Sequence, residues 1–184
     1  MTRWALAVLC VCAFAVPLSA VESFESGLGG WSTQGLWHRV ASTACVTPHE
    51  GSACIYFGQD NSCDYNNHLI KDASFSSGPV TLSNTATAFI SFWMLYEVES
   101  FQPSCYDQIR LERSSDGTNW SLLRKLSPGA DPAGGGPGVG DASGSGVGGT
   151  PLWQFYKVDL SAFVPGTLYV RFRFISSASL AGDP

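Results

Sequence analysis

Hydrophobic positions along the chain recur with period two or in short continuous runs, and no long stretch repeats with the helical period. The alternation is clearest in residues 168–175, where Val170, Phe172 and Phe174 alternate with Tyr169, Arg171 and Arg173. Such spacing is typical of a β-strand with one buried face. The pattern therefore predicts an all-β protein with roughly eight or nine strands.

Six strands can be placed by residue number, at 52–57, 87–98, 106–113, 120–126, 153–160 and 168–175. The run at 87–98 is almost wholly apolar, which predicts a central strand buried on both faces. Asp116-Gly117 predicts a hairpin turn, because glycine tolerates the positive φ of such turns. Many short antiparallel strands around an apolar core predict two packed sheets, an antiparallel jelly-roll sandwich.

The first twenty residues have the features of a secretory signal peptide. Arg3 precedes an apolar run from Trp4 to Val16, and the small residue Ala20 lies at the expected cleavage point. The run is too short to span a membrane. We therefore expect residues 1–20 to be cleaved and residues 21–184 to form one secreted domain, extracellular or periplasmic, with no membrane span after signal removal. Its Gly/Pro/Ser-rich segment 128–151 is expected to be a flexible loop.

Composition and charge exclude several classes of protein. Hydrophobic residues make up 45% of the chain and charged residues 14%, which excludes a coiled coil or wholesale disorder. The chain has 15 Asp and Glu against 10 Lys and Arg, without a basic cluster. Because phosphate binding needs a concentrated Lys/Arg face, we expect no nucleic-acid partner.

Four cysteines follow the predicted signal, Cys45, Cys54, Cys63 and Cys105. An even number in an exported protein predicts two disulfides. Three pairings are possible, and closeness in sequence favours Cys45 with Cys54 and Cys63 with Cys105. A zinc site is the alternative, but the spacing of the first three cysteines is not that of a zinc knuckle.

Short motifs occur in a familiar order, namely FESGLGGW (24–31), GLWH (35–38), YFGQ (56–59), ISFW (90–93), SDGTNW (115–120), VDLS (158–161) and VRFR (170–173). Together they resemble the MAM-like, concanavalin-like jelly-roll domains of secreted bacterial proteins, including non-catalytic modules of immune-inhibitor-A-type metallopeptidases. The resemblance covers residues 22–175. It implies an aromatic closing strand just where this chain stops, at Pro184, so we expect the closing C-terminal strand to be missing.

The resemblance also implies a structural calcium ion. It would place the Glu25 carboxylate beside oxygens of the turn from Glu50 to Ser52, and calcium is a hard cation that takes several oxygen ligands. Glu25, Glu50 and Ser52 are therefore the candidate metal residues. The alternative is that Glu25 is a solvated acid at a strand end.

No catalytic constellation is evident. Glu97 and Glu99 are the best acid pair, because positions i and i+2 of a strand project on one face about 7 Å apart, which suits a glycosidase. Surface acids are also common at such strand ends. The histidines have no zinc-protease spacing and there is no nucleophile-elbow motif, so we expect the chain not to be an enzyme.

Tryptophans near strand ends are the candidate ligand contacts. Trp31, Trp37 and Trp153 are placed to stack on a sugar, with burial in the core as the alternative. The leading hypothesis is a secreted, non-enzymatic binding or adhesion module that recognises extracellular protein or carbohydrate through surface loops. The alternatives are an accessory fragment of a secreted hydrolase such as a metallopeptidase, and, less favoured, a jelly-roll glycosidase that uses Glu97 and Glu99.

Overall fold

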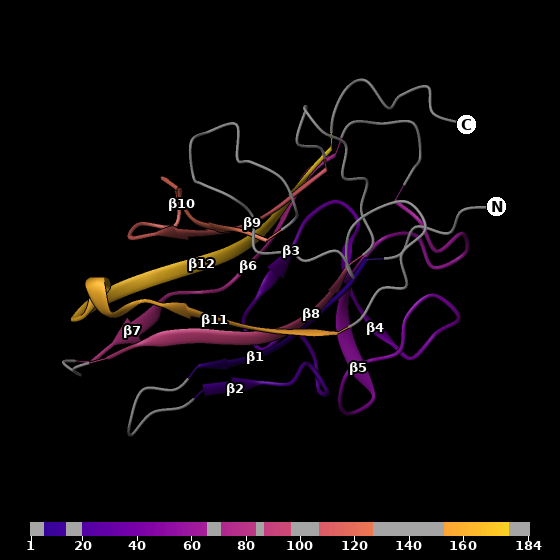
Figure 1. Ribbon diagram of the computed structural model, residues 1–184, viewed down its shortest axis with the longest axis horizontal. Helices are drawn as coiled ribbons and strands as arrows, with labels where there is room; N and C mark the ends of the chain where they lie inside the picture. The colour runs from indigo at the N-terminus through magenta and orange to yellow at the C-terminus, as the bar shows by residue number, and fades with distance from the viewer. Residues whose placement is uncertain are drawn as a thin grey trace.

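A computed structural model describes residues 6–13, 20–65, 71–83, 87–96, 107–126 and 153–176, with side chains from Glu22 onward. These residues form two six-stranded antiparallel sheets that lie as two layers (Figure 1). A single turn of 3-10 helix, η1 (Ser161–Phe163), precedes the last strand. The prediction of an all-β, antiparallel protein is thus confirmed. No helix in the described part of the chain is long and apolar enough to cross a membrane.

The first layer, sheet A, has the strand order β11 (Gln154–Asp159), β8 (Phe89–Tyr96), β1 (Leu6–Ala13), β5 (Ala53–Phe57) and β4 (Trp37–Ala41), with β2 (Ala20–Glu22) paired to β1. The second layer, sheet B, has the order β10 (Ser121–Lys125), β9 (Gln108–Ser114), β12 (Gly166–Ile175), β6 (Asp72–Ser76) and β3 (Ser32–Thr33), with β7 (Val80–Leu82) paired to β12. All these neighbouring strands are antiparallel to each other.

The six strands placed from the sequence are present as β5, β8, β9, β10, β11 and β12. The predicted hairpin joins β9 to β10, and Gly117 has a φ of 75°. The Asp116 carboxylate accepts hydrogen bonds from the backbone N–H groups of Thr118 (2.8 Å) and Asn119 (2.7 Å). An aspartate that bonds the backbone within its own turn, followed by a glycine with positive φ, explains why this turn could be predicted.

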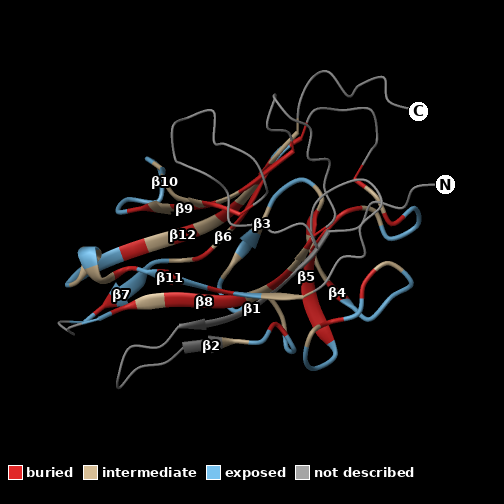
Figure 2. Cartoon of the chain, viewed as in Figure 1, coloured by how far each residue is buried: buried red, intermediate tan, exposed pale blue. Residues whose placement is uncertain are grey.

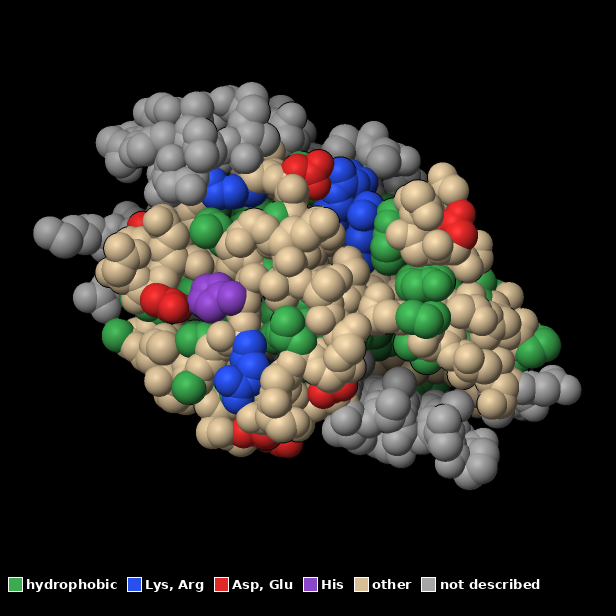
Figure 3. All heavy atoms as spheres, turned by 180° about the vertical axis from the view of Figure 1, so that it is seen from behind, with side chains coloured by type: hydrophobic (Ala, Val, Ile, Leu, Met, Phe, Trp, Pro, Cys, Tyr) green, Lys and Arg blue, Asp and Glu red, His purple; other side chains and the backbone are tan. Residues whose placement is uncertain are grey.

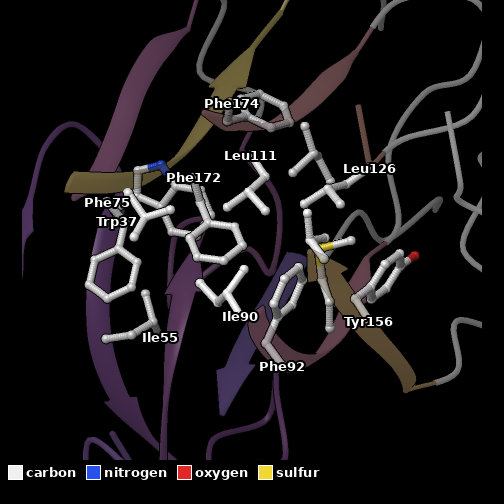
Figure 4. Close-up of a cluster of buried hydrophobic side chains, with 14 of the residues drawn as sticks. Trp37, Ile55, Phe75, Ile90, Phe92, Leu111, Leu126, Tyr156, Phe172 and Phe174 are labelled. Carbon is white, nitrogen blue, oxygen red and sulfur yellow. The ribbon is translucent and has the colours of Figure 1, made fainter. Parts of the chain in front are cut away.

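The core lies between the inner faces of the two sheets and is rich in aromatic side chains (Figure 4). Phe57 of β5 lies 4.4 Å from Phe174 of β12, and Phe92 of β8 meets Phe172 edge to face at 4.9 Å. These side chains are almost completely buried, and β5 is buried along its whole length (Figure 2). Full burial of such side chains contributes about 1.5–3 kcal/mol each, so this core is the main source of stability.

Strand β8 is not buried on both faces, contrary to expectation. Ile90, Phe92 and Met94 point into the core, whereas Phe89 and Trp93 are only half-buried. In a sandwich of two sheets, the inner face of a central strand meets the opposite layer and its outer face meets only loops or solvent. The apolar residues on the outer face of β8 therefore need another explanation.

Strand β1 consists of residues that the sequence assigns to the signal peptide. It pairs with β8 from Leu6 to Ala13, and with β5 from Leu6 to Val8. The pairing with β8 shifts register between Val8 and Cys10. Cleavage after Ala20 would therefore remove a strand from the middle of sheet A.

Several sequence predictions fall outside the described residues. These are the loop at 128–151, the segment from 177 to the C-terminus, the acid pair Glu97 and Glu99, and Cys105. Seen from behind, the described surface carries acidic and basic side chains in small separate groups, without one broad field of either sign on that face (Figure 3).

Candidate functional site

Aromatic side chains gather on the outer face of sheet A, and we call this group, His49, Trp93, Trp153 and Phe155, the aromatic platform. The imidazole of His49 stacks on Trp93, with ring centroids 4.0 Å apart and planes inclined by 14°. Trp153 meets His49 edge to face at 5.6 Å, and Phe155 lies 5.4 Å from Trp93. The four rings therefore form one continuous series of ring contacts, in the order Trp153, His49, Trp93 and Phe155.

Strand alternation explains why two of these rings face outward. Phe155 in β11 is directly opposite Trp93 in β8, so both side chains lie on the same face of the sheet. Their neighbours Tyr156 and Phe92 point into the core and stack on each other at 5.3 Å. Phe155 is 54% exposed, the most exposed large hydrophobic residue in the described part of the chain. An apolar ring held in water beside other rings is a feature of binding surfaces.

Of the other two rings, Trp153 directly precedes β11, and His49 comes from the β4–β5 loop (residues 42–52), which folds back over the outer face of sheet A. Val46 is buried and packs with Cys54 and Tyr56 of β5. This contact brings the loop across the sheet as far as Trp93 of β8. Glu50, the next residue after His49, is 72% exposed on its side chain, with one carboxylate oxygen 3.6 Å from His49 Nδ1. The platform thus has a carboxylate at its rim.

A disulfide between Cys45 and Cys63 holds the first part of this loop. The pairing favoured from the sequence, Cys45 with Cys54 and Cys63 with Cys105, is therefore wrong. Cys54 lies within β5, buried on the outer face of the sheet, and is a free thiol. Burial raises the pKa of Cys54 to about 12, so the thiol stays protonated at neutral pH. Closeness in sequence failed as a guide because a strand carries Cys54 away from the two loops that the disulfide joins.

Glu25 holds the last part of the loop. Its carboxylate accepts hydrogen bonds from the backbone N–H of Ser52 (3.0 Å), from the backbone N–H of Ala53 (3.1 Å) and from the Ser52 hydroxyl. The Ser52 hydroxyl, followed by the two backbone N–H groups, lowers the pKa of Glu25. Hydrogen bonds to the charged form have this effect because they stabilise the carboxylate. The structure therefore brings Glu25 and Ser52 together as a clamp on the loop.

The same residues do not fit a calcium site by themselves. Calcium takes about six to eight oxygen ligands, but the groups that surround the Glu25 carboxylate are hydrogen-bond donors. Glu50 lies at the rim of the platform, beside His49. In the part of the chain that the structure describes, no three His, Cys, Asp or Glu side chains form a metal-binding group. Calcium binding through Glu25, Glu50 and Ser52 stays a prediction.

The three tryptophans predicted as ligand contacts lie in three different environments. Trp37 is 2% exposed, and its indole N–H donates to the carbonyl oxygen of Ala73 at 3.2 Å. Trp31 is half-buried and stacks on Phe75 at 4.5 Å, next to the core. Trp153 lies on the outer face of sheet A and belongs to the platform. Of the three tryptophans, only Trp153 therefore lies next to a group of outward-facing rings.

The sequence analysis missed His49, Trp93 and Phe155. Phe155 carries a readable signal, because it alternates with Tyr156 and Val158 in the pattern of a strand with one exposed face. Trp93 carries none, since it lies in a run in which both faces look apolar. His49 could not be found from local sequence, because only the fold of the loop brings it to Trp93.

Comparison with known proteins gives one match, which is structural. The chain resembles the crystal structure of the K2 cleaved adhesin domain of Lys-gingipain, with a TM-score of 0.50 and 24% sequence identity over 84% of this chain and 93% of that one. No family model and no curated protein matches the sequence. The match supports the fold of two packed β-sheets.

Proposed function

We propose that this chain is a secreted, non-enzymatic binding or adhesion module of the jelly-roll type, and that it holds an extracellular protein or carbohydrate against the aromatic platform. The observation that carries the proposal is the 54% exposure of Phe155 at the edge of a cluster of three further rings. A solitary exposed phenylalanine would need no explanation, but one continuous with Trp93, His49 and Trp153 forms a surface.

The chemistry of the platform suits a ligand with both apolar and polar groups. Aromatic rings bury large areas against the C–H faces of sugars or against apolar side chains, at little cost in conformational entropy. The Glu50 carboxylate at the rim can accept hydrogen bonds from sugar hydroxyls or from peptide N–H groups. The ligand would thus lie on a sheet face bordered by one loop, rather than on loops alone.

Two further observations support export and adhesion. The Cys45–Cys63 disulfide favours an oxidising compartment outside the cytosol. The structural likeness is to a domain described as an adhesin. That domain is a cleaved part of Lys-gingipain, so the same likeness supports the second candidate, an accessory fragment of a secreted hydrolase.

A pair of matched variants tests the proposal. Phe155→Ser removes the exposed ring of the platform, and Val80→Ser removes the other exposed large hydrophobic residue of the described part of the chain, 37% exposed on β7 of sheet B. The ligand probes are chitohexaose and cellohexaose in calorimetric titrations, and immobilised gelatin in a surface-binding assay. Unfolding curves for all three proteins show whether either substitution has changed the fold.

We expect the parent chain to bind at least one of these probes, and Phe155→Ser to weaken that binding at least about tenfold, which corresponds to 1.4 kcal/mol. Val80→Ser should bind like the parent. Equal binding by the parent and by Phe155→Ser would contradict the proposal, and so would a parent chain that binds none of the probes.

A further inference from the structure

We propose that the partner held on the aromatic platform is a peptide segment, extended and rich in proline, with a basic residue beside Glu50 and an acidic residue beside Lys157. The inference rests on the proposed function, since it concerns the same platform, and it goes beyond that function by naming the class of ligand and its charges. Two observations carry it, namely the inclination of the rings and the opposite charges that border them.

The rings of the platform do not lie in one plane. Trp93 and Phe155 are inclined to each other by 56°, and His49 and Trp153 by 72°. Only His49 and Trp93 are nearly parallel, and they stack face to face, so each covers one face of the other. A flat sugar face can stack only on rings that share a plane. The platform therefore suits a ligand whose apolar groups point in several directions.

A proline-rich peptide has apolar groups of this kind. Its pyrrolidine rings and aliphatic side chains project on different sides of an extended chain, and aromatic surfaces of several binding domains recognise such chains. The chain is already extended when free, so little conformational entropy is lost on binding. The inclination of the rings thus favours a peptide over a sugar chain.

The charge at one border of the platform is negative. The Glu50 side chain is 72% exposed, and one of its oxygens lies 3.6 Å from Nδ1 of His49. A Lys or Arg side chain of a partner can lay its alkyl stem on the rings and bring its charged head to this carboxylate. We therefore expect a basic residue of the ligand at the Glu50 border.

The charge beyond Phe155 is positive. Lys157 follows Phe155 by two positions in β11, so both side chains project from the outer face of sheet A, and both are exposed. The Lys157 ammonium lies 3.7 Å from the ring centroid of Phe89. The acid two positions further on, Asp159, accepts a hydrogen bond from the backbone N–H of Ser161 at 2.7 Å. None of the ion pairs among the described residues involves Lys157, so its charge can meet a carboxylate of the ligand.

The two borders together select the class of ligand. Glu50 borders His49 and Lys157 lies beyond Phe155, so rings separate the two charges, by a distance on the order of 10–15 Å. Four steps of an extended peptide cover about 13 Å. A neutral glycan matches neither charge, an acidic glycan matches only Lys157, and a cationic glycan matches only Glu50. A peptide carries both signs at this spacing.

The experiment compares three blocked peptides of equal length, with the sequences KPLPE, KPLPK and EPLPE. Dissociation constants are measured by NMR titration of the parent chain and of the variants Glu50→Lys and Lys157→Glu. These three ligands make the result independent of the direction in which a peptide lies, because KPLPE can present its two charges correctly in one orientation or the other. Asp72→Lys is the matched control, since it changes the net charge as Glu50→Lys does, at a side chain 54% exposed on sheet B.

We expect the parent chain to bind KPLPE at least about threefold more tightly than either of the other peptides. Glu50→Lys should bind EPLPE most tightly, and Lys157→Glu should bind KPLPK most tightly. An altered order of preference cannot arise from a variant that merely fails to fold. The control Asp72→Lys should keep the order of the parent, and all preferences should weaken at high salt, which screens exposed charges.

Three results would overturn the inference. One is a parent chain that binds none of the peptides, or binds all three equally. Another is the parental order of preference in both Glu50→Lys and Lys157→Glu. The third is the same altered order in Asp72→Lys as in Glu50→Lys, which would trace the effect to net charge alone. If chitohexaose or cellohexaose binds and is displaced by loss of the Phe155 ring while no peptide binds, the proposed function stands and this inference fails.

Discussion

The outer faces of the two sheets differ although their inner faces share one core. On sheet B, the outward-facing Glu112 is 4% exposed and is held by arginines, with Arg171 Nη2 at 2.6 Å and Arg173 Nη1 at 3.6 Å. Arg173 also pairs with Asp72 at 2.6 Å, and Arg171 lies over the ring of Trp120. On sheet A, the outer face carries aromatic rings, and Phe155 is open to water.

The difference shows how a sandwich can separate stability from recognition. On sheet B, the ion pairs of Glu112 and Asp72 with Arg171 and Arg173 join neighbouring strands to one another. The rings on sheet A are packed side by side, yet they keep an apolar surface exposed to water, which costs free energy unless a ligand covers it. Under the proposed function, the outer face of sheet B stabilises the fold and that of sheet A binds the ligand.

The largest expected effect is the loss of stability when the buried carboxylate on the outer face of sheet B is removed. Glu112→Ala leaves Arg171 without its partner in a half-buried position, and we expect a loss of about 3 kcal/mol in the free energy of unfolding. Asp72→Ala, which removes a carboxylate 54% exposed on its side chain, should cost less than about 1 kcal/mol. Urea unfolding of both variants measures the difference, and equal losses would contradict the structural role of Glu112.

A smaller effect is expected from the disulfide that fixes the β4–β5 loop. The double variant Cys45→Ser, Cys63→Ser opens a closed loop with a sequence separation of 18, and we expect it to lose about 2–3 kcal/mol of stability. Because His49 reaches Trp93 only through this loop, ligand binding should weaken as well. Denaturant unfolding and probe titration, each compared with Cys54→Ala, would separate the disulfide from the mere loss of a cysteine. Unchanged binding would show that the loop does not position the platform.

The smallest expected effect is on how stability depends on pH, through Glu25 at the other end of the β4–β5 loop. Hydrogen bonds from Ser52 and Ala53 lower the pKa of Glu25, so the folded chain binds a proton there less readily than the unfolded chain. The resulting stability is present above the unfolded pKa, about 4.3, and is lost as the pH falls through the folded pKa. Other acids with lowered pKa values, such as Asp72 and Asp159, also contribute to acid sensitivity.

Glu25→Gln isolates the part of the acid sensitivity that comes from the hydrogen bonds between Glu25 and the β4–β5 loop. Between pH 6 and pH 3, the thermal midpoint of the variant should fall less steeply than that of the parent. The two curves should converge at the acid end, where the parent carboxylate is protonated. Parallel curves would mean that the clamp does not contribute to stability.

The sequence predicts the strands better than the site. Strands follow from patterns among neighbouring residues, whereas the site depends on contacts between residues far apart in the sequence. Alternation in β12 and the Asp116-Gly117 turn are local, and both are present. The disulfide partner of Cys45 depends on how a loop folds over β5, which neither spacing nor residue type encodes. The same holds for His49, which stacks on a residue 44 positions away in sequence.

Tryptophan placement shows the same limit. Trp37 and Trp153 both lie near strand ends and look alike in the sequence, yet Trp37 starts a strand with its side chain inward, while Trp153 precedes β11 on the outer face of its sheet. A shift of one residue in the alternation decides which face of the sheet a strand side chain takes. Phase can be read from alternation in β12, but not from the continuous apolar runs around Trp93.

The central claim is that ligands bind on the outer face of sheet A. Hydroxyl-radical footprinting of the chain with and without a bound probe tests it directly, because oxidation reports the solvent access of each ring. We predict that binding protects Phe155 and Trp153 and leaves Trp120, on the outer face of sheet B, as reactive as before. Protection of Trp120 with unchanged oxidation of Phe155 and Trp153 would contradict the claim.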